Sequence, residues 1–250
     1  KVVCASTFAM FAAGRAFEII RNSIGYTHAN VKICATHAGI TVGEDGASHQ
    51  TFEDIALMRT IPGMTVLNPS DGVSARALIK QAVAFDGPAY IRLGRAAVPT
   101  FYTEEMAAKL EIGKGVCLRT GDKKDGKPAD ATVIATGIMV NEAMLAAEEL
   151  AADGIEVRVI DMHTVKPLDA DIIYRAARET GAIVTAEEHS VIGGLGSAVA
   201  EVTATHYPVK MAMVGQQDTF GESGKPDELK AKYGMTAADI VRAVKLLIEA

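Results

Sequence analysis

The sequence predicts an α/β fold made of two doubly wound domains, the first with a mostly parallel sheet and the second a smaller α/β unit. Two observations support this prediction. Short apolar runs alternate with amphipathic stretches along the chain, which is typical of parallel sheets covered by helices on both faces. The alternation stops once, over residues 101–129, and then resumes, as expected at a connection between domains.

The first unit is expected to contain four strands and three helices. Residues 1–5 and 31–36 are too apolar for half-exposed strands and suit buried parallel ones. Asp71 is a suitable N-cap for the helix that follows it. The expected strands cover residues 1–5, 31–36, 64–68 and 89–93, and the expected helices cover residues 8–23, 51–59 and 71–84.

The second unit repeats the same alternation. Residues 101–129, above all the polar and turn-rich segment 120–128, are interpreted as an interdomain connection with a hairpin-like excursion. Thr236 is the expected N-cap of the last helix. The expected strands cover residues 130–136, 156–160, 182–186 and 209–214, and the expected helices cover residues 140–152, 170–179, 194–206 and 237–248.

Composition indicates a globular chain that binds neither nucleic acid nor membrane. The 250 residues are 49% hydrophobic and 22% charged, so the chain can bury a sizeable core. The net charge of −6 and the lack of a basic stripe argue against binding to phosphate backbones. No apolar run approaches the roughly 20 residues that a membrane-spanning helix needs. We therefore expect a cytoplasmic protein.

The three cysteines, Cys4, Cys34 and Cys117, each lie in an apolar, strand-like context. This placement and their odd number favour buried thiols in a reducing compartment. The sequence contains no CxxC pair and no His/Cys cluster with metal-ligand spacing. We therefore expect no metal ligand in this chain.

The most informative segment is a glycine-punctuated loop over residues 36–50, THAGITVGEDGASHQ, which follows an apolar run. It carries His37, His49 and the carboxylates Glu44 and Asp45. Its three glycines permit tight turns that bring short polar side chains together. The loop is predicted to hold a substrate, although each residue alone also fits an ordinary solvated connection.

A second glycine-rich turn, residues 193–197, precedes a predicted helix. Its backbone N–H groups could hold a phosphate, or its glycines could allow close helix–strand packing. The spacing is not GxGxxG, and no acidic residue ends a strand about 20 residues later. The packing role is therefore favoured.

The loop sequence closely resembles the corresponding loop of transketolases, and seven further segments resemble that family in the same order. These segments are residues 6–11, 69–72, 91–95, 165–169, 187–189, 193–196 and 221–226. The resemblance extends through nearly the entire chain. It implies a pyrimidine-binding domain over residues 1–110 that lacks its N-terminal part, a linker over residues 111–129, and a transketolase C-terminal domain over residues 130–250.

The resemblance also implies that part of the active site comes from elsewhere. In transketolases a glutamate drives tautomerisation of thiamine diphosphate, and its segment would precede Lys1. The GDG motif and the later Asn-Asn pair, which hold the diphosphate and its divalent metal, are not found in the sequence. The implied partner is an N-terminal transketolase subunit that holds most of the Mg²⁺ coordination. A naturally split enzyme is favoured over a trimmed single chain, and at least a dimer is expected.

By the same resemblance, Phe8 and Phe11 would pack on the aminopyrimidine ring of the cofactor, although a Phe pair also fits an ordinary helix core. His49 would lie beside the cofactor amino group and hydrogen-bond the substrate near the reacting carbon. Many relatives carry a third aromatic residue where this chain has Gly14. The ring pocket is then closed differently, with Arg15 and Phe17 as the two candidates.

Substrate recognition is assigned in the same way. His37 and Arg95 would bind the phosphate of the sugar, and Asp45 would accept a hydrogen bond from a sugar hydroxyl. The catalytic assignment is His49 together with His37. Glu44 is expected to be a structural or dimer-contact residue.

Other charged and histidine residues are given structural roles. His28, His163 and His206 are expected to be surface histidines or histidines whose polar atoms are all hydrogen-bonded. The segment 187–189, Glu-Glu-His, is assigned to subunit packing, because the resemblance places it away from the reaction centre.

The function implied is that of the C-terminal subunit of a thiamine-diphosphate-dependent transketolase of the pentose phosphate pathway type. Such an enzyme transfers a two-carbon ketol unit from a ketose phosphate to an aldose phosphate. Three alternatives stay open: a 1-deoxy-D-xylulose-5-phosphate synthase-like chain, the β subunit of a 2-oxo acid dehydrogenase, and a non-catalytic scaffold subunit. His37 and Asp45 favour the sugar-phosphate enzyme, since a pyruvate-type donor needs neither residue.

Overall fold

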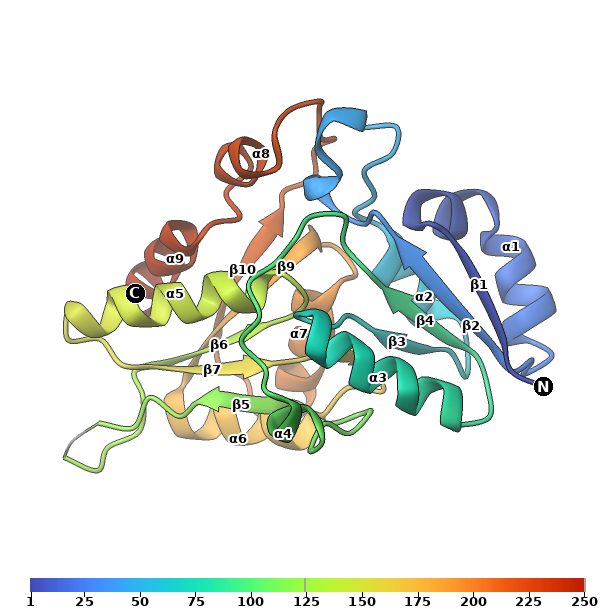
Figure 1. The fold of residues 1–250 in the computed structure, drawn as a ribbon. Helices are drawn as coiled ribbons and strands as arrows, with labels where there is room; N and C mark the ends of the chain where they lie inside the picture. Colours follow the sequence, from blue (N-terminus) through green and yellow to red (C-terminus); the bar gives the residue numbers. More distant parts are fainter. Residues whose placement is uncertain (124, 250) are drawn as a thin grey trace.

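The computed structural model describes residues 1–123 and 125–249, which form two five-stranded sheets with helices packed on them (Figure 1). The first sheet has the order β1-β2-β4-β3-β8, and the second has the order β10-β9-β6-β7-β5. In each sheet four strands are parallel and one edge strand, β8 or β5, is antiparallel. The predicted α/β class is confirmed, and both sheets are mostly parallel.

The strands of the first sheet are β1 (Val3–Phe8), β2 (Val31–Thr36), β3 (Thr65–Leu67), β4 (Ala89–Arg92) and β8 (Thr164–Lys166). One face packs on the N-terminal helical segments and α2 (Asp54–Thr60). The other face packs on α3 (Gly72–Ala84) and α4 (Glu104–Ala107). The N-terminal helical segments are η1 (Phe11–Arg15), α1 (Phe17–Ile19) and η2 (Ile20–Gly25).

The strands of the second sheet are β5 (Val116–Arg119), β6 (Ala131–Ala135), β7 (Val157–Asp161), β9 (Ala182–Ser190) and β10 (Lys210–Gln216). Helices α5 and α9 pack on one face, and α6 and α7 pack on the other (Figure 1). The helices of this half are α5 (Met139–Ala152), α6 (Ala170–Thr180), α7 (Leu195–His206), α8 (Pro226–Lys232) and α9 (Ala237–Glu249).

Two short strands were not predicted, and both join regions that are distant in sequence. β5 lies inside the predicted linker and pairs with β7. β8 belongs to the second half of the chain but pairs with β3 of the first sheet. Segments of three or four residues carry little periodicity, so their remote partners decide their structure. β9 also runs four residues beyond its expected end, which brings residues 187–190 into the sheet.

The prediction of a buried first strand is wrong for β1. Residues 3–7 are exposed, because β1 is an edge strand with a neighbour only on one side. The same reason overturns the prediction of three buried thiols. Cys4 and Cys117 are exposed on the edge strands β1 and β5, and Cys34 is partly buried on β2. An apolar run predicts a strand but does not reveal its position in the sheet.

α9 begins at Ala237 as expected, and Thr236 occupies the N-cap position, since its backbone carbonyl accepts from Ile240 N at 3.2 Å. The Thr236 hydroxyl donates to Asp239 Oδ2 at 2.6 Å. The backbone donors are satisfied by carboxylates, since Thr236 N donates to Asp239 and Ala237 N donates to Glu142 Oε2 at 2.9 Å.

Among the described residues no helix has the length and apolarity needed to cross a membrane.

Asp71 caps α3 as predicted and also fixes the chain that leaves β4. Its Oδ1 atom accepts from Val73 N and Ser74 N at 3.1 and 2.8 Å. Its Oδ2 atom accepts from Phe101 N and Tyr102 N at 3.0 and 2.9 Å. One carboxylate therefore satisfies four backbone donors from two segments.

We expect Asp71→Ala to lower the free energy of unfolding by about 2–4 kcal/mol, because it removes a cap and leaves two further buried donors without acceptors. Thr103→Ala is the control, since Thr103 caps only the exposed start of α4. That variant should lower the free energy of unfolding by about 1 kcal/mol. Urea unfolding of both variants measures the difference, and equal losses would contradict the role given to Asp71.

The three unassigned histidines differ in environment. His28 and His206 are exposed, as expected. His163 is fully buried, with its Nδ1 atom 3.0 Å from Thr164 Oγ1. Its Nε2 atom has no partner among the described residues, so the expectation of a surface or fully bonded side chain is wrong there. Burial penalises the charged ring and lowers the pKa of His163 to about 4.

This pKa shift predicts a pH dependence of stability. Between about pH 4 and 6.5 the unfolded state binds more protons at His163 than the folded state, so stability rises with pH through this window. His163→Gln should abolish up to about 3 kcal/mol of that rise, while His206→Gln should leave it unchanged. Urea unfolding from pH 4.5 to 7.5 tests this, and parallel curves for all three proteins would refute it.

Candidate functional site

The predicted substrate loop begins where β2 ends, at the carboxyl end of the first sheet. Ligands commonly bind at this end of parallel strands. His37 is the first residue after β2 and has a left-handed backbone, with φ 58°. This conformation is rare for residues other than glycine and is concentrated at functional sites. Residues 40–45 then form the short 3-10 segment η3 (Ile40–Asp45), which lies beside α8 (Figure 1).

Four of the predicted site residues meet at this edge. β1 and β2 are parallel with Phe8 opposite Thr36, so Phe8 and His37 lie side by side. Their ring centroids are 3.9 Å apart with planes at 10°. Phe11 is nearly parallel to Phe8 at 5.9 Å. His49 meets both phenyl rings edge-on, at 6.2 and 5.5 Å. The fold therefore assembles an aromatic and imidazole cluster that remains partly open to solvent.

The two histidines of this cluster are each oriented by a neighbouring hydroxyl. His37 Nδ1 lies 3.0 Å from Thr36 Oγ1, and His49 Nδ1 lies 2.9 Å from Ser48 Oγ. Neither Nε2 atom has a hydrogen-bond partner within residues 1–123 and 125–249. Each ring can therefore offer Nε2 to a ligand as a donor or an acceptor.

Arg95 and Asp45 lie at η3. Arg95 Nη1 donates to Val42 O and to Glu44 Oε2, both at 2.9 Å. A backbone hydrogen bond and the Arg95 guanidinium lower the pKa of Glu44. Asp45 is exposed at the end of η3. In the described part of the chain no hydrogen bond, ion pair or cation–π contact joins Arg95 or Asp45 to the aromatic cluster. Ring contacts therefore join four of the six predicted residues.

Next to Gly14, which stands where many relatives carry a third aromatic residue, a charged side chain covers the ring of Phe11. The Arg15 guanidinium carbon lies 4.9 Å from the centroid of the Phe11 ring, which is a cation–π distance. Phe17 instead packs against the buried cluster between α2 and the sheet. Of the two candidates, Arg15 is therefore the residue that borders the aromatic cluster.

The structure also shows site residues that the sequence did not identify. Gln50 is buried and donates through Nε2 to Ile40 O and Gly43 O at 3.3 Å and to Glu222 O at 2.9 Å. This amide joins residues 40 and 43 of η3 to the segment 221–226. That segment was recognised as a motif, but no signal in the sequence indicated which loop it would contact.

A buried ionic network lies under the loop. Asp54 Oδ2 accepts from Tyr90 Oη at 2.8 Å and from Arg92 Nε at 2.9 Å. Arg92 Nη2 donates to the backbone carbonyl of Glu188 at 2.8 Å. The carboxylate of Glu188 accepts from Thr41 N at 2.7 Å. Burial raises the pKa of Glu188, and the Arg92 guanidinium opposes that effect.

The assignment of residues 187–189 to subunit packing is wrong. All three side chains are buried within one chain. Glu188 and His189 contact backbone N–H groups of the first half, whereas Glu187 accepts from the start of α7. Burial lowers the pKa of His189 to about 4, and its Nδ1 atom lies 2.7 Å from Ser190 O. The expectation failed because β9 continues through this segment and carries it into the interior, whereas a shorter strand would have left it at the surface.

Glu187 explains the second glycine-rich turn. Its carboxylate accepts from Leu195 N and Gly196 N at 2.6 and 2.7 Å, at the start of α7. Burial raises the pKa of Glu187 to about 7. A Cβ atom at Gly194 would lie 2.0 Å from Glu187 Oε2. The turn therefore serves close packing, and an internal carboxylate occupies the N–H groups that a phosphate would need.

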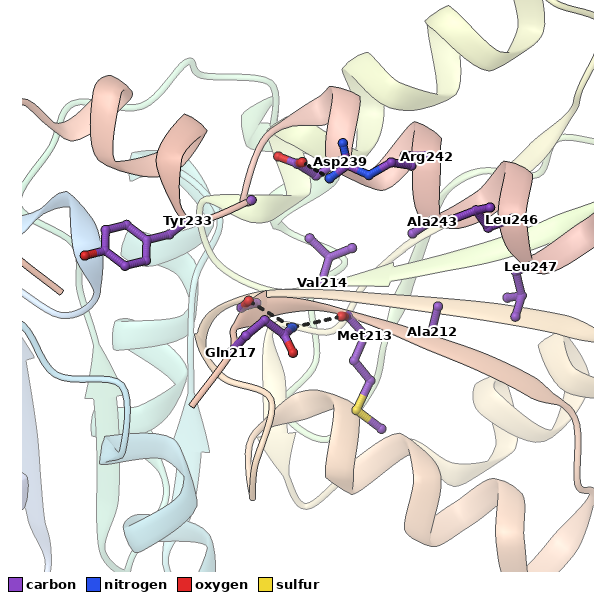
Figure 2. A pocket seen from close by; sticks show the side chains of 12 residues that line it. Ala212, Met213, Val214, Gln217, Tyr233, Asp239, Arg242, Ala243, Leu246 and Leu247 are labelled. Atoms are coloured by element: carbon purple, nitrogen blue, oxygen red, sulfur yellow. Dashed lines mark hydrogen bonds and ion pairs between the residues drawn. The ribbon is translucent and has the colours of Figure 1, made fainter. Parts of the chain in front are cut away.

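Two further observations concern ligand sites elsewhere. Within residues 1–123 and 125–249, no three His, Cys, Asp or Glu side chains lie close enough to hold a metal ion. A cavity of about 400 Å³ lies between β10 and α9, lined by apolar residues such as Val214 and Leu247, with the Asp239–Arg242 ion pair at its side (Figure 2). None of the predicted site residues lines this cavity.

Comparisons with known proteins agree with the fold. Residues 1–100 match the transketolase pyrimidine binding domain, and residues 123–240 match the transketolase C-terminal domain. The chain is 47% identical to a putative transketolase C-terminal section of Methanocaldococcus jannaschii, over 98% of this chain and 74% of that protein. It is 45% identical to the 6-deoxy-6-sulfo-D-fructose transketolase subunit SqwH of Clostridium sp. (strain MSTE9), over 100% of this chain and 74% of that subunit.

A solved split-gene transketolase, described as an inactive beta4 tetramer, superposes with a TM-score of 0.90 at 51% identity. The match covers 100% of this chain and 77% of that one. Both domain matches, the sequence identity and the fold thus agree. The chain belongs to the transketolase family, of which it contains the pyrimidine-binding and C-terminal domains.

Proposed function

We propose that this chain is the C-terminal subunit of a thiamine-diphosphate-dependent transketolase, which transfers a two-carbon ketol unit from a ketose phosphate to an aldose phosphate. The observation that carries the proposal is the convergence of Phe8, Phe11, His37 and His49 at the carboxyl edge of the first sheet. A scaffold subunit would have no need for such a cluster at an open edge.

The cluster suits a planar heteroaromatic group. Phe8 and Phe11 are parallel within 4°, and His49 borders both of them edge-on. Aromatic rings pack favourably on one another in such stacked and edge-on arrangements. Thiamine diphosphate, when bound, supplies the electron sink that cleavage of a ketose beside its carbonyl requires. The contribution of Phe8 and Phe11 is to orient its aminopyrimidine ring.

Polar residues of the loop recognise the sugar in this proposal. His49 hydrogen-bonds the substrate through Nε2 near the reacting carbon. Asp45 accepts a hydrogen bond from a sugar hydroxyl, and His37 binds the phosphate together with Arg95. Both hydrogen bonds of Arg95 within the described residues come from Nη1. Its Nε and Nη2 atoms can therefore form the planar fork that suits phosphate oxygens.

The proposal includes a partner subunit that contributes the diphosphate-binding domain and most of the Mg²⁺ coordination. Two relatives are described as a C-terminal section and as a subunit, which supports a divided enzyme. The related split-gene transketolase described as an inactive beta4 tetramer supports self-association of this chain without activity. We place the assembled enzyme in the cytoplasm.

The decisive experiment measures ketol transfer from xylulose 5-phosphate to ribose 5-phosphate with thiamine diphosphate and Mg²⁺. The chain is assayed alone and mixed with the N-terminal subunit. Activity only in the mixture is the expected result. Pyruvate turnover without ketol transfer would instead assign the chain to the deoxyxylulose-phosphate or oxo-acid enzymes.

In the assembled enzyme, His37→Ala and Arg95→Ala should each raise KM for the phosphorylated donor roughly 10- to 100-fold. Each variant loses a hydrogen bond to a charged group, worth about 1.5–3 kcal/mol. Binding of thiamine diphosphate should change little. Arg242→Ala, on α9, is the surface control. Loss of sugar and cofactor binding together, or of neither, would refute these assignments.

Binding of the cofactor has its own test. Phe8→Ala should weaken binding of thiamine diphosphate by the assembled enzyme roughly tenfold, because an aromatic contact is worth about 0.5–1.5 kcal/mol beyond its buried area. Phe17→Ala is the matched control, since Phe17 packs beside α2. Titration calorimetry compares the two variants. A larger effect of Phe17 on cofactor affinity would exclude Phe8 from the binding site.

A further inference from the structure

Glu188 belongs to β9 of the second sheet, but its carboxylate contacts the loop that follows β2 of the first. Its Oε1 atom accepts a hydrogen bond from Thr41 N at 2.7 Å, and the side chain is only 2% exposed. Hydrogen bonds from backbone N–H groups to ionised carboxylates are shorter and stronger than those between neutral groups. The second half of the chain therefore holds the loop by a specific polar contact.

The loop backbone is shaped around this carboxylate. Gly39 has φ +83°, and a Cβ atom at this position would lie 2.2 Å from Glu188 Cδ. Only glycine permits both the conformation and the close approach. Gly39 and Thr41 come two and four residues after His37, whose own backbone is left-handed. A contact at Thr41 thus restrains the short segment that orients the His37 ring.

The charge of Glu188 is balanced by the guanidinium of Arg92. Arg92 Nη1 is 4.0 Å from Glu188 Oε2, and Arg92 Nε is 2.9 Å from Asp54 Oδ2. A buried carboxylate needs such a partner to remain ionised. Arg92 is also held by its own hydrogen bond to Glu188 O. The carboxylate therefore has a fixed position from which to hold Thr41.

We propose that Glu188 is a positioning residue for sugar-phosphate binding, which acts by fixing the segment 37–41 through its bond to Thr41 N. The residue touches neither of the two His37 ring nitrogens, so it acts through the loop. Its effect on substrate rests on the proposed function, whereas its effect on the loop does not.

Glu187 provides a matched control on the same strand. Both glutamates are buried, both are ionisable, and both accept bonds from backbone N–H groups. The partners of Glu187 are Leu195 N and Gly196 N at the start of α7, away from the loop. Substitution at either position disturbs the interior, but only substitution at Glu188 removes the contact with Thr41.

The experiment compares Glu188→Ala, Glu188→Gln and Glu187→Ala in the full chain by hydrogen exchange of the peptide that covers residues 38–46. We expect Glu188→Ala to exchange at least about tenfold faster at Thr41, because its amide loses its acceptor. Glu188→Gln retains an oxygen acceptor, so the exchange rate of Thr41 in this variant should fall between the rates in Glu188→Ala and in the unmodified chain. Glu187→Ala should leave this peptide protected while α7 exchanges faster.

In the assembled enzyme, Glu188→Ala should raise KM for the phosphorylated donor more than it lowers kcat, and Glu188→Gln should partly restore KM. Should Glu188→Ala fail to fold, Glu188→Gln decides the question by the same two measurements. Unchanged protection of residues 38–46 in the Glu188 variants, or equal loosening in Glu187→Ala, would overturn the positioning role. Absence of ketol transfer by the unmodified assembly would refute the proposed function, while the exchange result would still decide the role of Glu188.

Discussion

The rest of the structure depends on one buried cation, the guanidinium of Arg92 at the end of β4. It lies between Asp54 of the first half and Glu188 of the second, with side chains that are 3%, 0% and 2% exposed. Removing one member of such a group would leave an uncompensated charge in the interior. The two sheets are therefore joined by ionic contacts that require one particular arrangement, in addition to apolar packing that tolerates several.

This arrangement explains why the candidate site is a product of both halves. The loop after β2 carries both histidines, but its backbone is held by Glu188 at Thr41 and by Glu222 O at Gln50. The aromatic side chains come from the end of β1 and from η1. The first sheet supplies the aromatic and histidine side chains, and the second half of the chain contacts the loop that carries the two histidines.

Much of the fold could be predicted from local pattern. Alternating apolar and amphipathic runs gave most strands and helices within a few residues, and Asp71 gave the start of α3. The short strands β5 and β8 could not be predicted, because a three- or four-residue strand is defined by its distant partner. The exposure of Cys4 and Cys117 was missed for a related reason, since apolar residues do not show whether a strand lies at an edge.

The sequence by itself determined the family resemblance, the α/β class and the identity of the residues in the loop of His37 and His49. These features follow from local patterns along the chain, which do not depend on which segments meet in space. Only the tertiary structure decided that Arg15 borders the Phe11 ring, that Glu187 occupies the start of α7, and that Glu188 reaches Thr41. Thr41 and Glu188 are 147 positions apart, and chain spacing carries no information about a contact that the packing of two sheets creates.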